Sequence, residues 1–547
     1  MKRIGLLGMI AALAAVLAAA VVYGSAYAPV IEPAKENIEE MWAIEDARQE
    51  SERPLVTALE NNGVPLGYDA ASNTFYYTLG LGSKEEWPEI HLTAPGADGV
   101  KMVFYDDYTY DWCEDAVREG YSYEVLAYND TEYSYFYVVF TGLMQVSLTS
   151  QEPLDKEDKP ARVSVHTSVG ALESNARVHH RGGITSYFAK HPYRVEFTRT
   201  GDGRNKIYQN VPELGTMNQF VLIPMWYDHA LMRDRLSWEI YGELAGEDRP
   251  YGARRLSYAE VFVNDCYEGV YLLLEPYDHR AEISKAGVEH AAADTVYCTA
   301  PIYEVLDRPT LQGSYTEGRG FALHYPPVKE DPFDDIRDYM EICQTEDDAA
   351  FAARVMEQID LDSLLGYHLF MQGIGLADNV YNNQFIWAAH EDGTTRYRFI
   401  PWDMDMTWAE DMHIEWVLDD YSGWLYFPIV DRLLNVNPDN IRARWAQMWK
   451  DMRKSVLTTE NVEAKLAQYM AELNDTGAAA RNAERWSTSS YNVESIELTS
   501  FAEVRFELMD RAVEYIASTE GRIPMLTYEA FGNEDGVANE AGEIYGF

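Results

Sequence analysis

The chain has 547 residues, 47% of them hydrophobic, which is more than one hydrophobic core usually serves, so we expect two or more domains. It carries 44 Lys and Arg against 90 Asp and Glu, a formal net charge of −46. Nucleic acids and anionic membrane surfaces bind basic faces, so this charge excludes a nucleic-acid partner and adsorption to an anionic membrane.

Residues 1–28 have the pattern of an export signal. Lys2 and Arg3 precede an apolar run over residues 4–23, and an A-x-A pattern ends at Ala28. This predicts export, cleavage after Ala28, and a secreted or cell-surface location. The run is about 20 residues, long enough to cross a bilayer, so an uncleaved anchor is the alternative and would be the chain's membrane contact.

The next part of the chain predicts a β-rich domain. Residues 29–63 are charged and weakly helical, which indicates a linker or surface helix. Residues 64–152 contain short strand-like runs separated by Gly, Pro, Asn and Asp, the pattern of a small β-sandwich. Its many tyrosines suit either a carbohydrate-binding face or ordinary strand positions.

The four cysteines are too scattered for a zinc site. They have no C-x-x-C pair, so disulfides in an exported protein and buried free thiols both stay open. Their positions are Cys113, Cys266, Cys298 and Cys343.

From residue 160 to about 525 the pattern predicts a small sheet with one inserted helix, followed by a helical half. The expected strands cover residues 161–167, 176–180, 193–198, 220–224, 259–264 and 269–275. The expected helices cover residues 228–244, 334–344, 349–359, 361–375, 427–448, 460–474, 476–486 and 500–519. Asp360 or Asp362 is expected to cap the helix over 361–375, and residues 526–547 form an acidic tail.

Residues 377–408 predict a hairpin with polar groups at its open end. Strand-like runs flank a turn signal at Asp392-Gly393. Asn383 lies ten residues before Gly393 and Asp403 ten after it, so pairing brings the two together, with Asp378 at the same rim. Oxygen ligands gathered in this way suit a hard cation such as Mg²⁺, and an exposed rim of solvated carboxylates is the alternative.

The spacing of these residues is that of phosphoryl-transfer enzymes. Asp378 and Asn383 form the D-x-x-x-x-N of a kinase catalytic loop, in which Asp accepts the substrate hydroxyl proton and Asn holds Mg²⁺. Asp403 has the place of the metal-binding Asp of kinases, and Asp405 is a candidate second ligand because alternate strand residues share a face. The D-x-D spacing also occurs in nucleotide-sugar transferases, so both classes stay open.

A basic segment over residues 179–194 is an exception in this acidic chain. It contains R-G-G-I-T-S from Arg181 onward, and such a Gly-bearing turn offers backbone N–H groups to phosphates. Lys190 is the candidate residue for binding the phosphates, and Arg181 and Arg194 lie near it in the sequence. The alternative is that this segment is a basic strand on the surface. On the helix over 228–244, Glu239 is the candidate partner of Lys190, whereas an i,i+4 pair with Arg235 is the plainer expectation.

The segments occur in the order R-G-G…K-x-P-Y-R-V-E-F, Y-D-x-x-L-x-R-x-x-L, V-F-V-N-D-x-Y-E-G-V-Y-L-L-x-E, D-N-V-Y-N-N and I-P-W-D-M-D. This order resembles the CotH family of spore-coat kinases and their exported relatives. The resemblance implies an α+β, atypical protein-kinase-like fold, with a small β-rich lobe and a helical lobe. It also implies transfer of the ATP γ-phosphate, with Mg²⁺ or Mn²⁺, to Ser or Thr of extracytoplasmic proteins.

The resemblance implies roles for individual residues as well. Asp378 is the catalytic Asp, Asn383 and Asp403 are metal ligands, and Lys190 binds phosphate. The glycine-bearing segment is less rich than the family pattern, and His191 replaces a second basic residue. A non-catalytic surface scaffold with a pseudokinase domain therefore stays an alternative.

Overall fold

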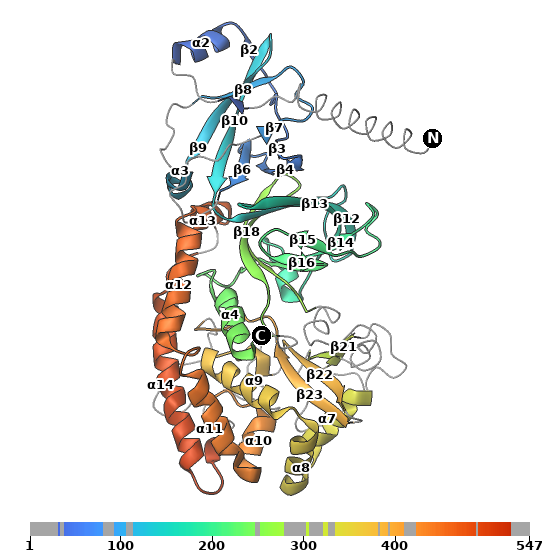
Figure 1. The fold of residues 1–547 in the computed structure, drawn as a ribbon, viewed down its shortest axis with the longest axis vertical. Coiled ribbons are helices and arrows are strands. Elements are labelled where there is room, and N and C mark those ends of the chain that lie inside the picture. Colours follow the sequence, from blue (N-terminus) through green and yellow to red (C-terminus); the bar gives the residue numbers. More distant parts are fainter. Residues whose placement is uncertain are drawn as a thin grey trace, which may run out of the picture. The chain divides into compact units, whose positions relative to one another are not determined.

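The computed structural model describes residues 31–32, 38–79, 92–105, 113–246, 252–277, 302–305, 321–325, 334–380, 383–391, 394–409, 423–487 and 491–526. The chain divides into two compact units (Figure 1). The first unit is Met1–Trp226, Arg255–Glu275 and Met470–Ser490, and the second is Tyr227–Arg254, Pro276–Tyr469 and Tyr491–Phe547. Among the described residues no helix is long and apolar enough to cross a membrane, and the apolar run over residues 4–23 lies outside them.

A mixed sheet of seven strands forms the N-terminal part of the first unit, within the described residues, in the order β1-β8-β9-β10-β6-β5 with β2 paired to β10. The strands are β1 (Ile31–Glu32), β2 (Gln49–Glu50), β5 (Gly67–Asp69), β6 (Thr74–Thr78), β8 (Lys101–Phe104), β9 (Ser122–Tyr128) and β10 (Glu132–Thr141). Beside it are α2 (Ile38–Asp46), α3 (Cys113–Glu119), β3 (Glu60–Asn61), β4 (Val64–Pro65) and β7 (Leu92–Thr93). Residues 29–63, expected to be a linker or a surface helix, thus contain the helix α2 together with the short strands β1, β2 and β3.

The alternation along β10 accounts for its tyrosines. Phe136 and Val138, at even-numbered positions, are buried in the core of this sheet, whereas Tyr133 and Tyr135, at odd-numbered positions, are half-buried. The tyrosine rings pack edge to face with their centroids 5.8 Å apart. These two tyrosines therefore occupy ordinary strand positions and pack against each other, which is one of the two expectations for the tyrosines of this region.

A closed barrel follows in the first unit, in the order β11-β12-β13-β14-β17-β19-β18. Its strands are β11 (Met144–Thr149), β12 (Lys159–Thr167), β13 (Gly170–His180), β14 (Tyr193–Thr198), β17 (Gln219–Ile223), β18 (Leu256–Val263) and β19 (Tyr267–Leu274). Strand β11 closes the barrel because it pairs antiparallel with β12 and parallel with β18. It thus belongs to the barrel, although the sequence pattern assigns it to the preceding domain.

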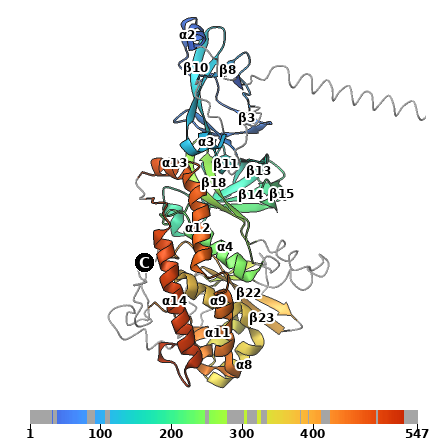
Figure 2. The same cartoon turned by 60° about the vertical axis from the view of Figure 1, so that its left-hand side comes forward.

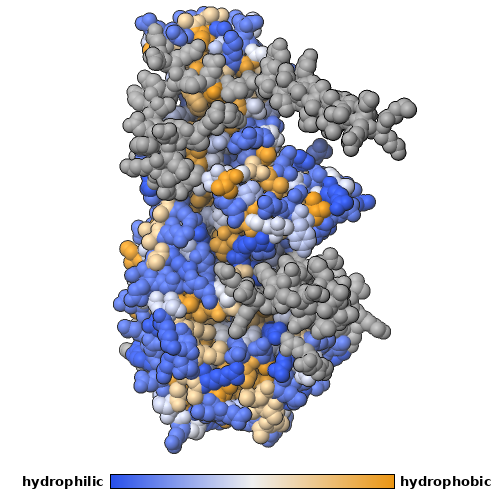
Figure 3. Space-filling model, in the orientation of Figure 1, coloured by the Kyte–Doolittle hydropathy of each residue, from blue (hydrophilic) through white to orange (hydrophobic). Residues whose placement is uncertain are grey.

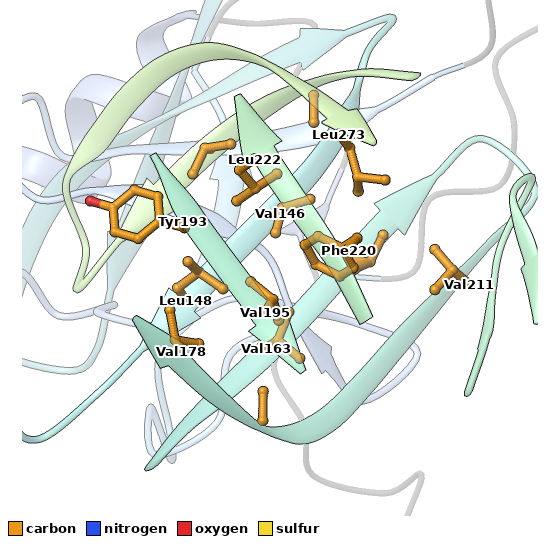
Figure 4. Packing of buried hydrophobic residues seen from close by; sticks show 14 of the residues in the cluster. Val146, Leu148, Val163, Val178, Tyr193, Val195, Val211, Phe220, Leu222 and Leu273 are labelled. Carbon is orange, nitrogen blue, oxygen red and sulfur yellow. The ribbon is translucent and has the colours of Figure 1, made fainter. Parts of the chain in front are cut away.

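Alternating apolar residues fill the barrel (Figure 4). Val146 and Leu148 of β11 share one buried cluster with Val163, Val195 and Phe220 from three other strands. The short elements η1 (Ile184–Tyr187), β15 (Gln209–Val211) and β16 (Gly215–Met217) lie between barrel strands in the sequence, and α13 (Ala478–Arg485) contacts β19. The expected small sheet is therefore a closed barrel.

The second unit combines helices with a sheet in the order β21-β20-β22-β23. Its strands are β20 (Ile302–Val305), β21 (Phe321–Tyr325), β22 (Gln384–Glu391) and β23 (Thr394–Pro401). Helix α4 (Arg233–Ala245) comes from the region before the C-terminal half. The helices of that half are α7 (Asp334–Gln344), α8 (Asp348–Gln358), α9 (Leu361–Ile374), α10 (Pro428–Val436), α11 (Ile441–Met452), α12 (Thr459–Asn474) and α14 (Ile496–Ser518). Helices α9, α11 and α14 lie side by side (Figure 2).

Local sequence signals set the ends of these helices. The Asp360 carboxylate accepts a hydrogen bond from the Ser363 N–H (3.1 Å), so Asp360 is the expected cap of α9. Gly375 ends α9 in the left-handed conformation. The helix expected over 427–448 is two helices, because Asn437 and Asn440 adopt left-handed conformations between them.

The fold confirms the expected α+β class. Hydrophilic residues cover most of the described surface on the face in Figure 3, as the net charge of −46 leads one to expect. Cys266 and Cys343 are free thiols. Cys298 and the acidic tail beyond residue 526 lie outside the described residues.

Candidate active site

The expected hairpin over residues 377–408 is present. Strands β22 and β23 pair antiparallel, with Gln384 opposite Pro401, and the turn at 392–393 lies outside the described residues. One step beyond that pair, the Asn383 carbonyl accepts a hydrogen bond from the Trp402 N–H (2.9 Å). Asn383 therefore lies opposite Trp402, and Asp403 follows at the same end of the hairpin.

Asp378 and Asn383 are brought together at this end. The Nδ2 of Asn383 donates a hydrogen bond to Oδ2 of Asp378, which lies in the turn η2 (Asp378–Val380). Asn383 and Asp403 have φ angles of 50° and 55°, in the left-handed region that few non-glycine residues adopt. The chain thus turns sharply at both ends of the paired strands, where the two candidate ligands lie.

Asn379 holds the turn in place, a role that the sequence did not reveal. Its Nδ2 donates to the Trp402 carbonyl (3.0 Å), and its own carbonyl accepts from Gln384 Nε2 (3.1 Å) and from the hydroxyl of Tyr367 (3.0 Å). Asn379 is completely buried. It thereby joins the Asp378 turn to the end of β23, and no spacing rule distinguishes it from its neighbours in D-N-V-Y-N-N.

Acidic side chains gather around Asp405. Burial, and then the charges of Asp403, Asp234, Asp378 and Asp228, raises the pKa of Asp405 well above its ordinary value. Asp228 and Asp234 are completely buried, and the sequence did not place either of them near Asp405, because both come from a segment more than 140 residues earlier. This excess of negative charge, with the amide of Asn383 beside it, fits a hard divalent cation.

The described residues contain no group of three or more His, Cys, Asp or Glu side chains arranged to hold a metal ion. The candidate ligands are therefore Asn383, Asp403 and Asp405. A magnesium ion commonly takes few protein ligands and completes its shell with phosphate oxygens and water. The residues present suit that mode of binding rather than a cage built from protein alone.

Helix α4 supports the loop that carries Asp403 and Asp405. Arg233 Nη1 pairs with Asp228 (2.9 Å) and its Nε donates to the Thr407 carbonyl (3.2 Å). The hydroxyl of Ser237 lies 3.1 Å from that of Thr407 and accepts from Trp408 Nε1 (3.0 Å). These buried contacts fix the loop from the side of α4.

Glu239, also on α4, has the plainer of its two expected partners. It accepts from Arg235 Nε (3.0 Å), the i,i+4 pair, and from Lys465 Nζ (3.2 Å). Burial opposes the charge of Glu239, but Arg235, Tyr469 and Lys465 outweigh it and lower the pKa of this carboxyl. These partners differ from the expected one, Lys190.

Lys190, in the first unit, is completely buried. Its Nζ donates to the Val270 carbonyl (2.5 Å) and to Asn482 Oδ1 (3.0 Å), and it lies 4.7 Å from the centre of the Tyr271 ring. Burial lowers the pKa of Lys190 well below its ordinary value, although Glu268 acts in the opposite direction. With no exposed surface, the ammonium reaches a phosphate only if neighbouring groups move.

The expected glycine-bearing turn precedes Lys190. Gly182 has a φ of 81°, and a Cβ there would collide with the Thr185 side chain, so the position requires glycine. Arg181 is half-buried, and its N–H donates to the Pro192 carbonyl (3.1 Å). Arg194 donates to Gln219 Oε1 from Nε (3.1 Å) and Nη2 (2.7 Å), and burial lowers its pKa.

Comparison with known proteins identifies the family of the chain. The family described as CotH kinase protein matches residues 178–509, more than half of the chain. The inner spore coat protein H of Bacillus subtilis (strain 168) is 26% identical over 298 residues, which cover 52% of this chain and 73% of that protein. The matched range contains every candidate site residue named above.

Proposed function

Because the chain belongs to the CotH kinase protein family, we propose that it is a metal-dependent kinase that transfers the γ-phosphate of ATP to Ser or Thr of extracytoplasmic proteins. One observation carries the proposal: Asn383 is hydrogen-bonded to Asp378 where β22 begins, and Asp403 follows the partner strand at the same end. A kinase needs an Asp for the acceptor hydroxyl beside an Asn and an Asp for the metal.

In this proposal each residue has one task. Asp378 orients the acceptor hydroxyl and accepts its proton, which places the nucleophile in line with the phosphate. Asn383 and Asp403 hold the cation, and Asp405 adds to the negative field around it. Bound Mg²⁺ or Mn²⁺ supplies the positive charge that the transferring phosphoryl group requires. The crowding of carboxylates around Asp405 supports this assignment, because a cation offsets that charge.

We assign the phosphates to the first unit. The backbone N–H groups of the Gly182 turn and the side chains of Arg181, Lys190 and Arg194 provide donors and positive charge. Glu239 has no task in this proposal, because its carboxylate neutralises Arg235 and Lys465. The two-lobed kinase architecture is part of the same proposal, with the barrel as the small lobe and the helical unit as the large one.

The expected location agrees with the relative's name. That relative is an inner spore coat protein, and the first 28 residues of this chain have the pattern of an export signal. We therefore propose a spore-coat or cell-surface location and a protein acceptor there.

Asp403→Asn tests the metal site at almost constant side-chain volume. We expect ATP with Mn²⁺ to raise the Tm of the wild type, because a ligand at 100 times its Kd stabilises by about 2.7 kcal/mol. The variant should lose most of this rise while its circular dichroism spectrum stays unchanged. Differential scanning fluorimetry measures both proteins.

Asp451→Asn is the matched control, because the Asp451 carboxylate is exposed and pairs with Lys454. It should keep the full rise. An equal rise in Asp403→Asn and the wild type would remove Asp403 from the site. The absence of a rise in the wild type at millimolar ATP would favour a non-catalytic scaffold, and a rise with UDP-sugars alone would favour a nucleotide-sugar transferase.

A further inference from the structure

The side chain that holds Lys190 comes from α13, which follows it by almost 300 residues in the sequence. Asn482 Oδ1 accepts from Lys190 Nζ (3.0 Å) and also from the Val270 N–H (3.0 Å). Val270 in turn accepts from Lys190 through its carbonyl (2.5 Å). Lys190, Val270 and Asn482 thus form a closed set of buried hydrogen bonds.

The amide of Asn482 is used for its oxygen alone. Asn482 is completely buried, and its Nδ2 has no hydrogen-bond partner among the described residues. Leaving a buried donor unsatisfied costs free energy, so the position is valuable for its acceptor rather than its donor. An Asp there would supply the same acceptor without the unused donor.

The backbone of β19 is shaped to receive this amide. Gly269 has a φ of 88°, and a Cβ at this residue would collide with Asn482 Oδ1 and lie 3.1 Å from Trp486 Nε1. Trp486 Nε1 donates to the Glu268 carbonyl (2.9 Å), and Arg485 Nε donates to the Tyr267 carbonyl (2.7 Å). Three successive residues of β19 thus determine where α13 sits.

The barrel strand β18 and the N-terminal sheet also hold α13, through Arg481. Arg481, the neighbour of Asn482, donates to the buried carboxylate of Glu260 from Nε (2.8 Å) and Nη2 (2.9 Å). The same guanidinium reaches Thr141 at the end of β10 (3.2 Å), and Tyr267 donates to Glu260 (2.7 Å). Strand β10, the barrel and α13 therefore share one buried polar network.

We propose that Asn482 is the positioning residue of Lys190, and that α13, anchored to β19 and to the N-terminal sheet, is the helix that holds the phosphate-binding lysine. This inference rests on the kinase function proposed above. The neutral amide of Asn482 holds the Lys190 side chain without neutralising its charge, and Lys190 moves out of this buried set when it contacts a phosphate. In kinases a helix-borne Glu holds the corresponding lysine, and here an amide from α13 takes its place.

The charged groups around Lys190 determine its response to pH. Glu268 on β19 raises the pKa of Lys190, burial lowers it more strongly, and Arg485 on α13 pairs with Glu268 (3.1 Å). The Tyr271 ring lies beside the ammonium. The net effect lowers the pKa, so Lys190 loses its proton, and its affinity for phosphate, at a lower pH than an ordinary lysine. A carboxylate at position 482 raises this pKa again.

The first measurement needs no nucleotide. We expect a double-mutant cycle of Lys190→Met and Asn482→Ala in the full chain, followed by chemical denaturation, to show coupling of at least about tenfold in the unfolding equilibrium constant. Additive effects of the two substitutions would overturn the proposal. Coupling in a wild type that neither binds nor turns over ATP would uphold the pairing and contradict the kinase function.

The second measurement follows KM for ATP and kcat between pH 6.5 and 9.5. We expect Asn482→Ala to raise KM about tenfold with kcat changed less than twofold. Asn482→Asp should restore KM and move the alkaline rise of KM to higher pH. Ala480→Asp adds the same charge at an exposed position of α13 and should leave both constants at their wild-type values. An unmoved alkaline limb in Asn482→Asp would overturn the proposal.

Discussion

Asn383 and Asp403 occupy left-handed conformations at the end of the hairpin, with φ angles of 50° and 55°. Such a conformation costs about 1 kcal/mol or more for a non-glycine residue, so the surrounding contacts must enforce it. The Trp402–Asn383 hydrogen bond (2.9 Å) and the bond from Asn379 to Trp402 (3.0 Å) do so here. Both candidate ligands are therefore held in a defined backbone geometry at this end of the hairpin.

His368 gives a test of the helical core at the residue scale. It is completely buried on α9, where its Nδ1 accepts from Trp445 Nε1 (3.2 Å). Burial lowers the pKa of His368 to about 3 from an ordinary value of 6.5. Below pH 6.5 the unfolded chain therefore takes up a proton that the folded chain refuses, and the folded state loses stability as the pH falls from 6.5 towards 3.

We expect this imidazole to cost the wild type about 2–3 kcal/mol of unfolding free energy between pH 6.5 and 4.5. His368→Gln keeps a neutral polar side chain and removes the titrating group, so its loss over the same interval should be smaller by that amount. Urea denaturation at the two pH values measures both proteins. Parallel losses in wild type and variant would show that His368 is not the group responsible.

At the scale of elements, local sequence signals were sufficient to predict features that depend on residues close together in the sequence. The hairpin was predicted because its strands flank a turn, and the cap of α9 was predicted because Asp360 lies next to the helix that it begins. These two features place Asp378, Asn383 and Asp403. The most specific part of the candidate site could therefore be predicted from the sequence.

Contacts between distant segments could not be predicted in this way. Closing the barrel requires β11 to pair in parallel with β18, more than 100 residues later, and no local pattern specifies that partner. The partner of Lys190 was missed for the same reason, since Asn482 lies on a helix near the end of the domain. Asp228 and Asp234 have no distinguishing spacing relative to Asp405 and emerge only from the folded structure.

Gly269→Ala tests how closely α13 must approach β19. An alanine there meets Asn482 Oδ1 and is strained at a φ of 88°, so we expect the unfolding free energy to fall by about 2 kcal/mol or more. Gly246→Ala is the matched control, because Gly246 has a φ of 83° and no heavy atom within 4 Å of an added Cβ. Chemical denaturation should show a larger loss at Gly269. Equal losses would mean that backbone strain alone accounts for both.

At the scale of the whole molecule, the N-terminal sheet is part of the architecture of the barrel. Gln145 on β11 accepts from the Gly67 N–H (3.1 Å), and Arg481 reaches both Thr141 and Glu260. A chain that begins at residue 160 lacks β11 (Met144–Thr149), the strand that closes the barrel. The full chain is therefore the proper material for functional tests.

The central claim is that Asp378 and the Asn383–Asp403 pair perform phosphoryl transfer, and incubation of the full chain with γ-labelled ATP and Mn²⁺ tests it most directly. We predict metal-dependent incorporation of phosphate into Ser or Thr of a protein, mapped by mass spectrometry, that falls at least about 100-fold in Asp378→Asn. Incorporation that is equal in the variant, or none in the wild type with either Mn²⁺ or Mg²⁺, would contradict the claim.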